Sequence, residues 1–158
     1  MKYNEMIKNA LNILANKEKY AYFYGAKGQL LTDAAMNALI KAEPKYFARY
    51  TKTQLEEIKE YSRGKIGFDC SGFITAISGV GGSSTTQWNN CMLNPCLQYG
   101  VAGSILHKEG HIGIDIGYGL FLHFPSELKT CTMQRIADFD WEQSGLLRSI
   151  DYTGASCI

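Results

Sequence analysis

A cysteine at the start of a helix constrains the fold of this chain more than any other sequence feature. Residues 68–73 read Phe-Asp-Cys-Ser-Gly-Phe and lead into further apolar residues, including Ile74 and Ile77. This run predicts that Cys70 lies in the first turn of a helix, where unpaired N–H groups and the macrodipole favour thiolate over thiol. A cysteine in that position is poised to attack a carbonyl carbon.

A hairpin is predicted some forty residues later. From His111 to Ile116 polar or small residues alternate with isoleucines, which is the period of a strand. Gly117–Gly119 supplies a turn into a second apolar strand, Leu120–Phe124, which contains His123. Both histidines can project from one hairpin, so the sequence predicts a nucleophile, a base and a partner that orients the base.

Length and charge limit the number of domains and the classes of partner that this chain can have. A chain of 158 residues that is 46% apolar can bury one sizeable core, so we expect a single domain over 1–158. The net charge of +1, with neither half strongly basic, argues against nucleic-acid binding. There is no long uncharged apolar stretch, so we expect no membrane insertion. Met1–Tyr20 alternates polar and apolar residues, unlike a secretory signal peptide, so we expect synthesis in the cytoplasm.

Five cysteines form no regular framework, so a disulfide scaffold is not expected. Cys91 and Cys96 are too widely spaced for a Cys-x-x-Cys redox or zinc motif, and we interpret them as packing residues. His107 is interpreted as a solvated loop residue. No metal site and no cofactor are predicted.

Helical spacing and capping residues organise the first half of the chain. Apolar positions predict an amphipathic helix from Asn4 to about Lys17. Thr32 is a candidate N-cap for a helix over 33–42, which Pro44 closes. Thr53 with Glu56 has the pattern of a capping box for a helix that stops at Gly64. Together these elements predict a helical insertion at about 29–65, which we expect to form a wall of the substrate groove.

The second half is predicted to be strand-rich. Residues 79–86, which read Gly-Val-Gly-Gly-Ser-Ser-Thr-Thr, indicate a flexible loop beside the site. After the hairpin, further strands are expected over 130–136 and 146–150, with a turn around 138–142.

Four segments together resemble the NlpC-type cell-wall cysteine peptidases, a papain-like family. They are Tyr-Phe-Tyr-Gly at 22–25, the run at 68–73, Gly-His-Ile-Gly-Ile at 110–114, and His123. A closing pattern of Trp141, Gly145, Leu147, Ile150, Asp151 and Tyr152 is similar to clostridial prophage lysins of this type. The resemblance implies an α+β fold, with the catalytic cysteine at a helix N-terminus packed on an antiparallel sheet.

The resemblance also implies roles for individual residues. Cys70 would be the nucleophile, His111 the base and His123 the residue that orients it. Tyr22 would help the Cys70 N–H to hold the oxyanion, with Tyr24 and Tyr61 as competitors for that role. Asp69 and Ser71 are candidate substrate-binding residues. The Asp69 carboxylate could cap the helix or bind a substrate amine, and the sequence leaves both open.

The implied activity is hydrolysis of an amide bond in the peptidoglycan stem peptide, typically between γ-D-glutamyl and a diamino acid. The expected setting is a phage or prophage endolysin that acts on the bacterial cell wall after release by a partner holin, and a tail-associated or conjugative-element wall enzyme would have the same features. The alternatives are an N-acetylmuramoyl-L-alanine amidase or an acyltransferase on the same scaffold. A noncatalytic zinc or interaction module is the alternative from another class.

Overall fold

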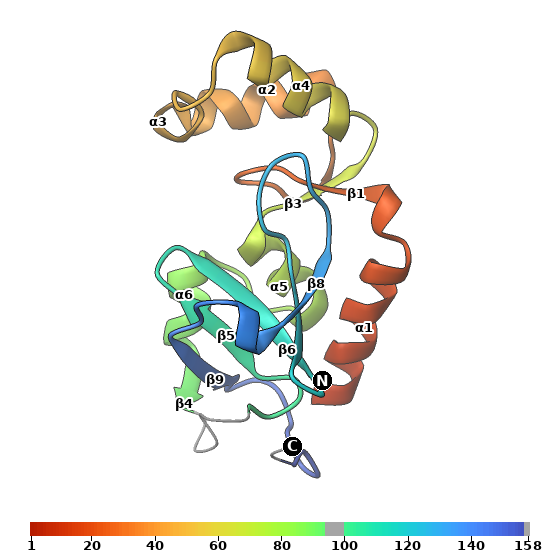
Figure 1. The fold of residues 1–158 in the computed structure, drawn as a ribbon, viewed down its shortest axis with the longest axis vertical. Helices are drawn as coiled ribbons and strands as arrows, with labels where there is room; N and C mark the ends of the chain where they lie inside the picture. Colours follow the sequence, from red (N-terminus) through yellow and green to blue (C-terminus); the bar gives the residue numbers. More distant parts are fainter. Residues whose placement is uncertain (94–99, 157–158) are drawn as a thin grey trace.

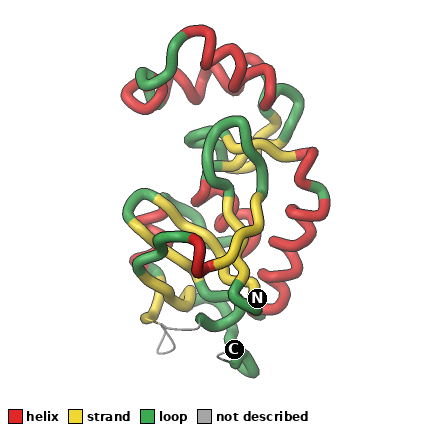
Figure 2. Tube along the Cα trace, viewed as in Figure 1, coloured by secondary structure: helices red, strands yellow, loops and turns green. Residues whose placement is uncertain are grey.

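Two sheets and the helices that cover them make up the fold. The computed structural model describes residues 1–93 and 100–156. The helices are α1 (Tyr3–Ala15), α2 (Asp33–Ala42), α3 (Pro44–Phe47), α4 (Lys52–Ser62), α5 (Cys70–Ser78) and α6 (Ser84–Asn89), with short 3-10 helices η1 (Lys17–Lys19) and η2 (Ile136–Asp138). The strands are β1 (Tyr20–Tyr22), β2 (Lys27–Leu30), β3 (Ile66–Phe68), β4 (Cys91–Leu93), β5 (Ile105–Lys108), β6 (His111–Gly117), β7 (Leu120–His123), β8 (Thr132–Arg135) and β9 (Gln143–Leu147). Figure 2 shows helices at the top, along one side and among the strands in the middle of the view.

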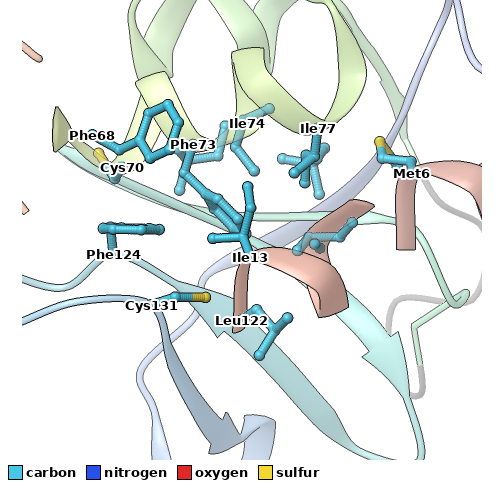
Figure 3. Close-up of a cluster of buried hydrophobic side chains, with 14 of the residues drawn as sticks. Met6, Ile13, Phe68, Cys70, Phe73, Ile74, Ile77, Leu122, Phe124 and Cys131 are labelled. Carbon is cyan, nitrogen blue, oxygen red and sulfur yellow. The ribbon is translucent and has the colours of Figure 1, made fainter. Parts of the chain in front are cut away.

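The larger sheet is antiparallel, with strand order β4-β9-β5-β6-β7-β8. Side chains alternate between its two faces. Ile112, Ile114 and Leu122 are fully buried on one face, in a cluster with residues of α1 and α5. Figure 3 shows Leu122 in this cluster with Phe73 and Ile74 of α5, and Cys70 at its edge next to Phe68. The predicted α+β class is therefore confirmed.

The smaller sheet joins the N-terminal segment to the cysteine. Its central strand β3 runs parallel to β1 and antiparallel to β2, with Tyr22 opposite Phe68. The residue after β3 is Asp69, and α5 begins immediately afterwards. This connection brings the 20–24 tyrosine segment alongside the start of the cysteine helix.

The helical segment α2–α4 packs around a second apolar cluster. Ala21, Phe23, Ala26, Leu31, Met36, Phe47 and Ile58 form its buried part. Figure 1 shows α2, α3 and α4 at the far end of the molecule from β4 and β9. The segment begins later than the predicted insertion at 29–65, because residues 27–30 form β2 of the smaller sheet.

The end of α2 and the start of α3 were only partly predicted. The helix over 33–42 is confirmed, with the Thr32 side chain accepting from the Ala35 N–H at 3.1 Å. Pro44 does not simply end this helix. It begins α3, because proline fits the first helical turn, where its missing N–H has no partner to lose.

The capping box of α4 lies two residues earlier than predicted. Thr51 and Gln54 form it, with Thr51 Oγ1 accepting from the Gln54 N–H at 3.2 Å and Gln54 accepting from the Thr51 N–H at 2.9 Å. The pair Thr53 and Glu56 has the same spacing but lies inside the helix. Glutamine makes the same reciprocal bond as glutamate, and the prediction of Thr53 and Glu56 as the capping box is wrong.

The remaining elements follow the predictions with shifted bounds. The first helix and the hairpin of β6 and β7 are confirmed. The strands predicted over 130–136 and 146–150 lie at 132–135 and 143–147. In the described part of the chain, no helix combines the length and the apolar character that crossing a membrane requires.

Candidate active site

Cys70 is the first residue of α5, as the sequence predicts. Asp69 before it has extended backbone, and its side chain accepts a hydrogen bond from the Gly72 N–H at 2.6 Å. This is the N-cap arrangement that stabilises a helix start. A Cβ at Gly72 would overlap the backbone oxygen of Ala26, so glycine is needed for this close approach. Local sequence therefore determines where the sulfur lies.

Donors within the protein hydrogen bond to the Asp69 carboxylate. Besides Gly72, its donors are the Gly25 N–H at 3.2 Å, the Ser71 hydroxyl at 3.0 Å and the Lys27 ammonium at 2.7 and 2.9 Å. Of the two roles left open by the sequence, the contacts show helix capping. Lys27, which no sequence pattern indicates, already binds the carboxylate where a substrate amine would have to bind. Substrate binding by Asp69 and Ser71 stays a prediction.

A pocket of about 300 Å³ opens beside Cys70. Residues from the β1–β2 connection, the end of α2 and the starts of α5 and α6 line it: Tyr24, Gly25, Lys27, Glu43, Asp69, Cys70, Ser71, Ser83 and Ser84. The segment predicted as a loop beside the site does reach this pocket. Its second part forms α6 instead of a loop, because Ser83 caps a helix by accepting from the Thr86 N–H.

Three adjacent strands place His111, His123 and Gln134 in a row. Nε2 of His111 lies 2.7 Å from Nδ1 of His123, and Nε2 of His123 lies 2.7 Å from Oε1 of Gln134. The two predicted histidines are therefore in direct contact, and the third member of the row was missed. Within the part of the chain that the structure describes, Nδ1 of His111 makes no hydrogen bond. That nitrogen remains open to a thiol or a substrate.

Aromatic rings enclose the two histidines. The indole of Trp141 stacks on His111, with centroids 5.5 Å apart and planes 7° apart, and Phe139 packs against His123 at 5.3 Å. Gly113 makes room for the indole, since a Cβ there would come within 3.1 Å of it. Burial lowers the pKa of His111 to about 3 and that of His123 to about 4. Both rings are therefore neutral at pH 7.

The sulfur of Cys70 lies beside the peptide that joins His111 to Ile112. The backbone N–H groups of Ile112 and Ser71 both hydrogen bond to it and lower the pKa of the thiol. Burial outweighs them and raises that pKa to about 11, and the charge of Asp69 adds to the rise. The expectation that the helix start favours a thiolate is therefore wrong for the free protein. Cys70 and His111 are a neutral thiol and a neutral imidazole.

Of the three candidate tyrosines, Tyr22 is the one that Cys70 affects most. Its side chain is buried, and after burial the charge of Cys70 is the largest cause of its raised pKa. Tyr24 lines the pocket, but three other causes raise its pKa more than Cys70 does. Tyr61 lies in α4 and lines a different cleft. Tyr22 therefore stays the predicted oxyanion donor, with Tyr24, which lines the pocket, as its competitor.

A buried carboxylate connects Tyr22 to the helical segment. Glu127 is 8% exposed and accepts from the Tyr46 hydroxyl at 2.7 Å and from the Tyr50 hydroxyl at 2.8 Å. Tyr46 also lies close enough to Tyr22 to lower the pKa of its hydroxyl. No local pattern predicts this network, because Glu127 lies 81 and 77 positions away from its two donors, Tyr46 and Tyr50.

Of the described residues, Cys91, Cys131 and His107 do not line the pocket beside Cys70. Cys91 is half-buried in β4 and Cys131 is buried in the main cluster, while Cys96 and Cys157 lie outside the described residues. His107 is not on a solvated loop as predicted. It lies in β5, where its ring stacks on Trp88 at 4.9 Å. Among residues 1–93 and 100–156, no three His, Cys, Asp or Glu side chains are grouped to hold a metal ion.

Comparison with known proteins shows which fold carries this site. NlpC1 from Trichomonas vaginalis superposes with a TM-score of 0.56 at 15% identity, over 90% of this chain. The peptidoglycan hydrolase RipB from Mycobacterium tuberculosis superposes with a TM-score of 0.54 at 16% identity, over 95% of this chain. The chain has the NlpC-type fold.

The resemblance predicted from the sequence is thus confirmed at the level of the fold. NlpC2 from Trichomonas vaginalis also has this fold, with a TM-score of 0.54 at 16% identity over 92% of this chain. The chain spans 44% and 46% of the length of the two Trichomonas proteins and 67% of RipB. No protein-family model and no curated protein matches the sequence. The likeness to clostridial prophage lysins stays a prediction.

Proposed function

We propose that the protein is a cysteine peptidase that hydrolyses an amide bond in the peptidoglycan stem peptide. One observation carries the proposal: the Cys70 sulfur, at the first turn of α5, accepts a hydrogen bond from the backbone N–H beside His111, whose ring is bonded to His123. A nucleophile, a base and an orienting partner in this order form the arrangement of a catalytic triad. RipB, one of the proteins with this fold, is a peptidoglycan hydrolase.

In the proposed reaction, Cys70 passes its proton to Nδ1 of His111 while the sulfur attacks the amide carbon. The resulting oxyanion accepts hydrogen bonds from the Cys70 N–H, which has no intrahelical acceptor at this position, and from the Tyr22 hydroxyl. When the carbon–nitrogen bond breaks, the His111 imidazolium protonates the leaving amine. Water then hydrolyses the thioester, with His111 as the base again, and the thiol is restored.

The neutral resting pair fits this sequence of steps. A thiol with a pKa near 11 is a poor nucleophile at pH 7 unless a base removes its proton as it attacks. His111 is neutral at that pH and has a free ring nitrogen, so it can take the proton. Charge separation then occurs only when a substrate is present to hold the oxyanion.

We propose the bond between γ-D-glutamyl and the diamino acid as the one cleaved, on the strength of the sequence resemblance. Release through a holin from a phage-infected or prophage-carrying cell is the proposed biological setting, on the same ground. If this setting holds, expression inside a bacterium should lyse the cells only after their membrane is permeabilised.

Digestion of purified cell walls tests the proposed function. Walls from several bacteria are incubated with the protein and with Cys70→Ala, and soluble products are analysed by mass spectrometry. We expect stem-peptide fragments with a new amine on the diamino acid, and none with the variant. Fragments with a free L-alanine amine would identify an amidase instead, and transfer to an added amine would identify an acyltransferase. Intact walls and intact isolated stem peptides would refute the proposal.

A further inference from the structure

Gln134 completes a row of three side chains across three strands. In the register of β7 and β8, Gln134 is opposite Phe121 and Thr132 is opposite His123. Gln134 is therefore the diagonal neighbour of His123 on the same face of the sheet, within reach of a long side chain. Its Oε1 lies 2.7 Å from Nε2 of His123.

The direction of this bond determines where the protons lie on both histidines. An amide oxygen can only accept, so Nε2 of His123 carries the proton and donates it. In a neutral imidazole the other nitrogen is then an acceptor, which makes Nδ1 of His123 the acceptor of the 2.7 Å bond to His111. Nε2 of His111 must be the donor there. The lone pair of His111 is left on Nδ1, the nitrogen that has no other partner in the described chain.

The reverse orientation would block the base. If the Gln134 amide group donated to His123, each bond in the row would reverse, and the proton of His111 would sit on Nδ1. A base that already holds a proton on its reactive nitrogen cannot take one from a thiol. The choice of acceptor or donor at position 134 is therefore transmitted through two rings to the reactive nitrogen.

We propose that Gln134 is a positioning residue that sets the tautomers of His123 and His111 and so keeps Nδ1 of His111 free of a proton. Its effect on hydrolysis rests on the proposed function, but its effect on the tautomers does not. Gln134 suits such a role because its residue is exposed and its backbone pairs with β7 whatever the side chain is. Substitution there changes the row of hydrogen bonds without opening a cavity in the core.

Three variants separate the possibilities. Gln134→Glu can only accept, Gln134→Lys can only donate, and Gln134→Leu can do neither. Met133→Leu is the control, because Met133 is an exposed neighbour on the same strand that bonds neither histidine. Nitrogen-15 NMR of the histidine rings at pH 7 reports which ring nitrogen holds the proton in each protein, whether or not the protein hydrolyses anything.

We expect Nε2 protonation on both histidines in the parent protein, in Met133→Leu and in Gln134→Glu. Gln134→Lys should shift the proton of His111 to Nδ1, and Gln134→Leu should give a mixture. With a working substrate, kcat should fall at least about tenfold in Gln134→Lys at nearly constant KM, and Gln134→Glu should keep most activity.

Two results would overturn the proposal: an Nδ1-protonated His111 in the parent, or the same tautomers in the Glu and Lys variants. Because both results are spectroscopic, they are distinct from a failure of the proposed function, which would show as intact cell walls with the parent protein.

Discussion

Tyr24 and Tyr46 stack face to face, with ring centroids 3.6 Å apart and planes 9° apart. Tyr24 lines the pocket beside Cys70, and Tyr46 lies in α3 of the helical segment. Through this pair the helical segment contacts a wall of the candidate site, and the bond of Tyr46 to Glu127 joins the segment to the loop between β7 and β8. The segment is therefore placed to affect both substrate binding and the Tyr22 hydroxyl.

The Tyr22 hydroxyl is predicted to support the reaction step and not substrate binding. Tyr22→Phe keeps the buried ring and removes the hydroxyl, so the fold should be retained. Loss of one oxyanion donor costs roughly 10²–10³ in kcat. Steady-state kinetics on a stem peptide should show this fall with little change in KM. Tyr61→Phe is the matched control, since Tyr61 lines a different cleft, and an equal fall in both variants would remove Tyr22 from this role.

Glu43 tests whether the helical segment forms a wall of the substrate groove. It is exposed at the end of α2 and lines the pocket, so Glu43→Ala should raise KM several-fold and leave the melting temperature unchanged. Glu56→Ala is the control, because Glu56 is exposed on α4 and outside the pocket lining. If both variants bind and hydrolyse stem peptides like the parent, α2–α4 is scaffold only.

Cys70 should be the first of the three described free cysteines to react with iodoacetamide. Burial raises the pKa of Cys70 to about 11 and that of Cys91 and Cys131 to about 12, and of the three only Cys70 lines the pocket beside the site. Alkylation, followed by mass spectrometry, should be slow at pH 7 and should accelerate as pH rises. His111→Ala should slow both alkylation and hydrolysis, because it removes the proton acceptor. Prior labelling of Cys91 with hydrolysis intact would contradict Cys70 as the nucleophile.

His123 is predicted to act through His111, so the choice of replacement matters. His123→Gln can still accept the bond from Nε2 of His111, whereas His123→Ala leaves that nitrogen without a buried partner. Hydrolysis should therefore fall much less in the glutamine variant than in the alanine variant. Equal activity of His123→Ala and the parent protein would mean that His123 is a packing residue.

The buried histidines should make stability depend on pH. His123 is 1% exposed, and its pKa falls from 6.5 to about 4 on folding, so the unfolded chain binds more protons between these values. The contribution of the neutral His123 ring to the free energy of unfolding is complete above pH 6.5 and is lost as pH falls towards 4. Asp115, whose pKa burial raises to about 6, acts in the opposite direction. Urea unfolding at pH 7 and pH 5 isolates His123: the loss of stability should be about 2 kcal/mol smaller in His123→Gln than in the parent. Equal losses would argue against a neutral buried His123.

Local patterns account for what could be predicted from the sequence. The Cys70 helix start depends on Asp69 and Gly72, which are its immediate neighbours. The hairpin that joins His111 to His123 depends on a period of two and a glycine turn, so both histidines were placed correctly. Two residue pairs near the start of α4 have the spacing of a capping box. The sequence alone does not distinguish them, and the prediction named the wrong pair.

Contacts between distant segments account for what was missed. Lys27 reaches Asp69 across 42 positions, and Trp141 reaches His111 from beyond β8. Gln134 meets His123 only because of the register of β7 and β8, and no local pattern specifies that register. The pKa of Cys70 was misjudged for the same reason, since the burial that raises it comes from the whole surrounding core.

The stacking of Trp141 on His111 gives the protein an optical property. The chain has two tryptophans, and each lies parallel to a histidine ring, Trp88 on His107 and Trp141 on His111, both at 7°. A protonated imidazole accepts an electron from an excited indole and quenches its fluorescence, whereas a neutral ring does not. In a Trp88→Phe background, the emission of Trp141 therefore reports protonation of the His111–His123 pair, because both imidazole rings pack against this indole. Proton uptake by this pair can be followed as a fall in the fluorescence of Trp141, without an added label.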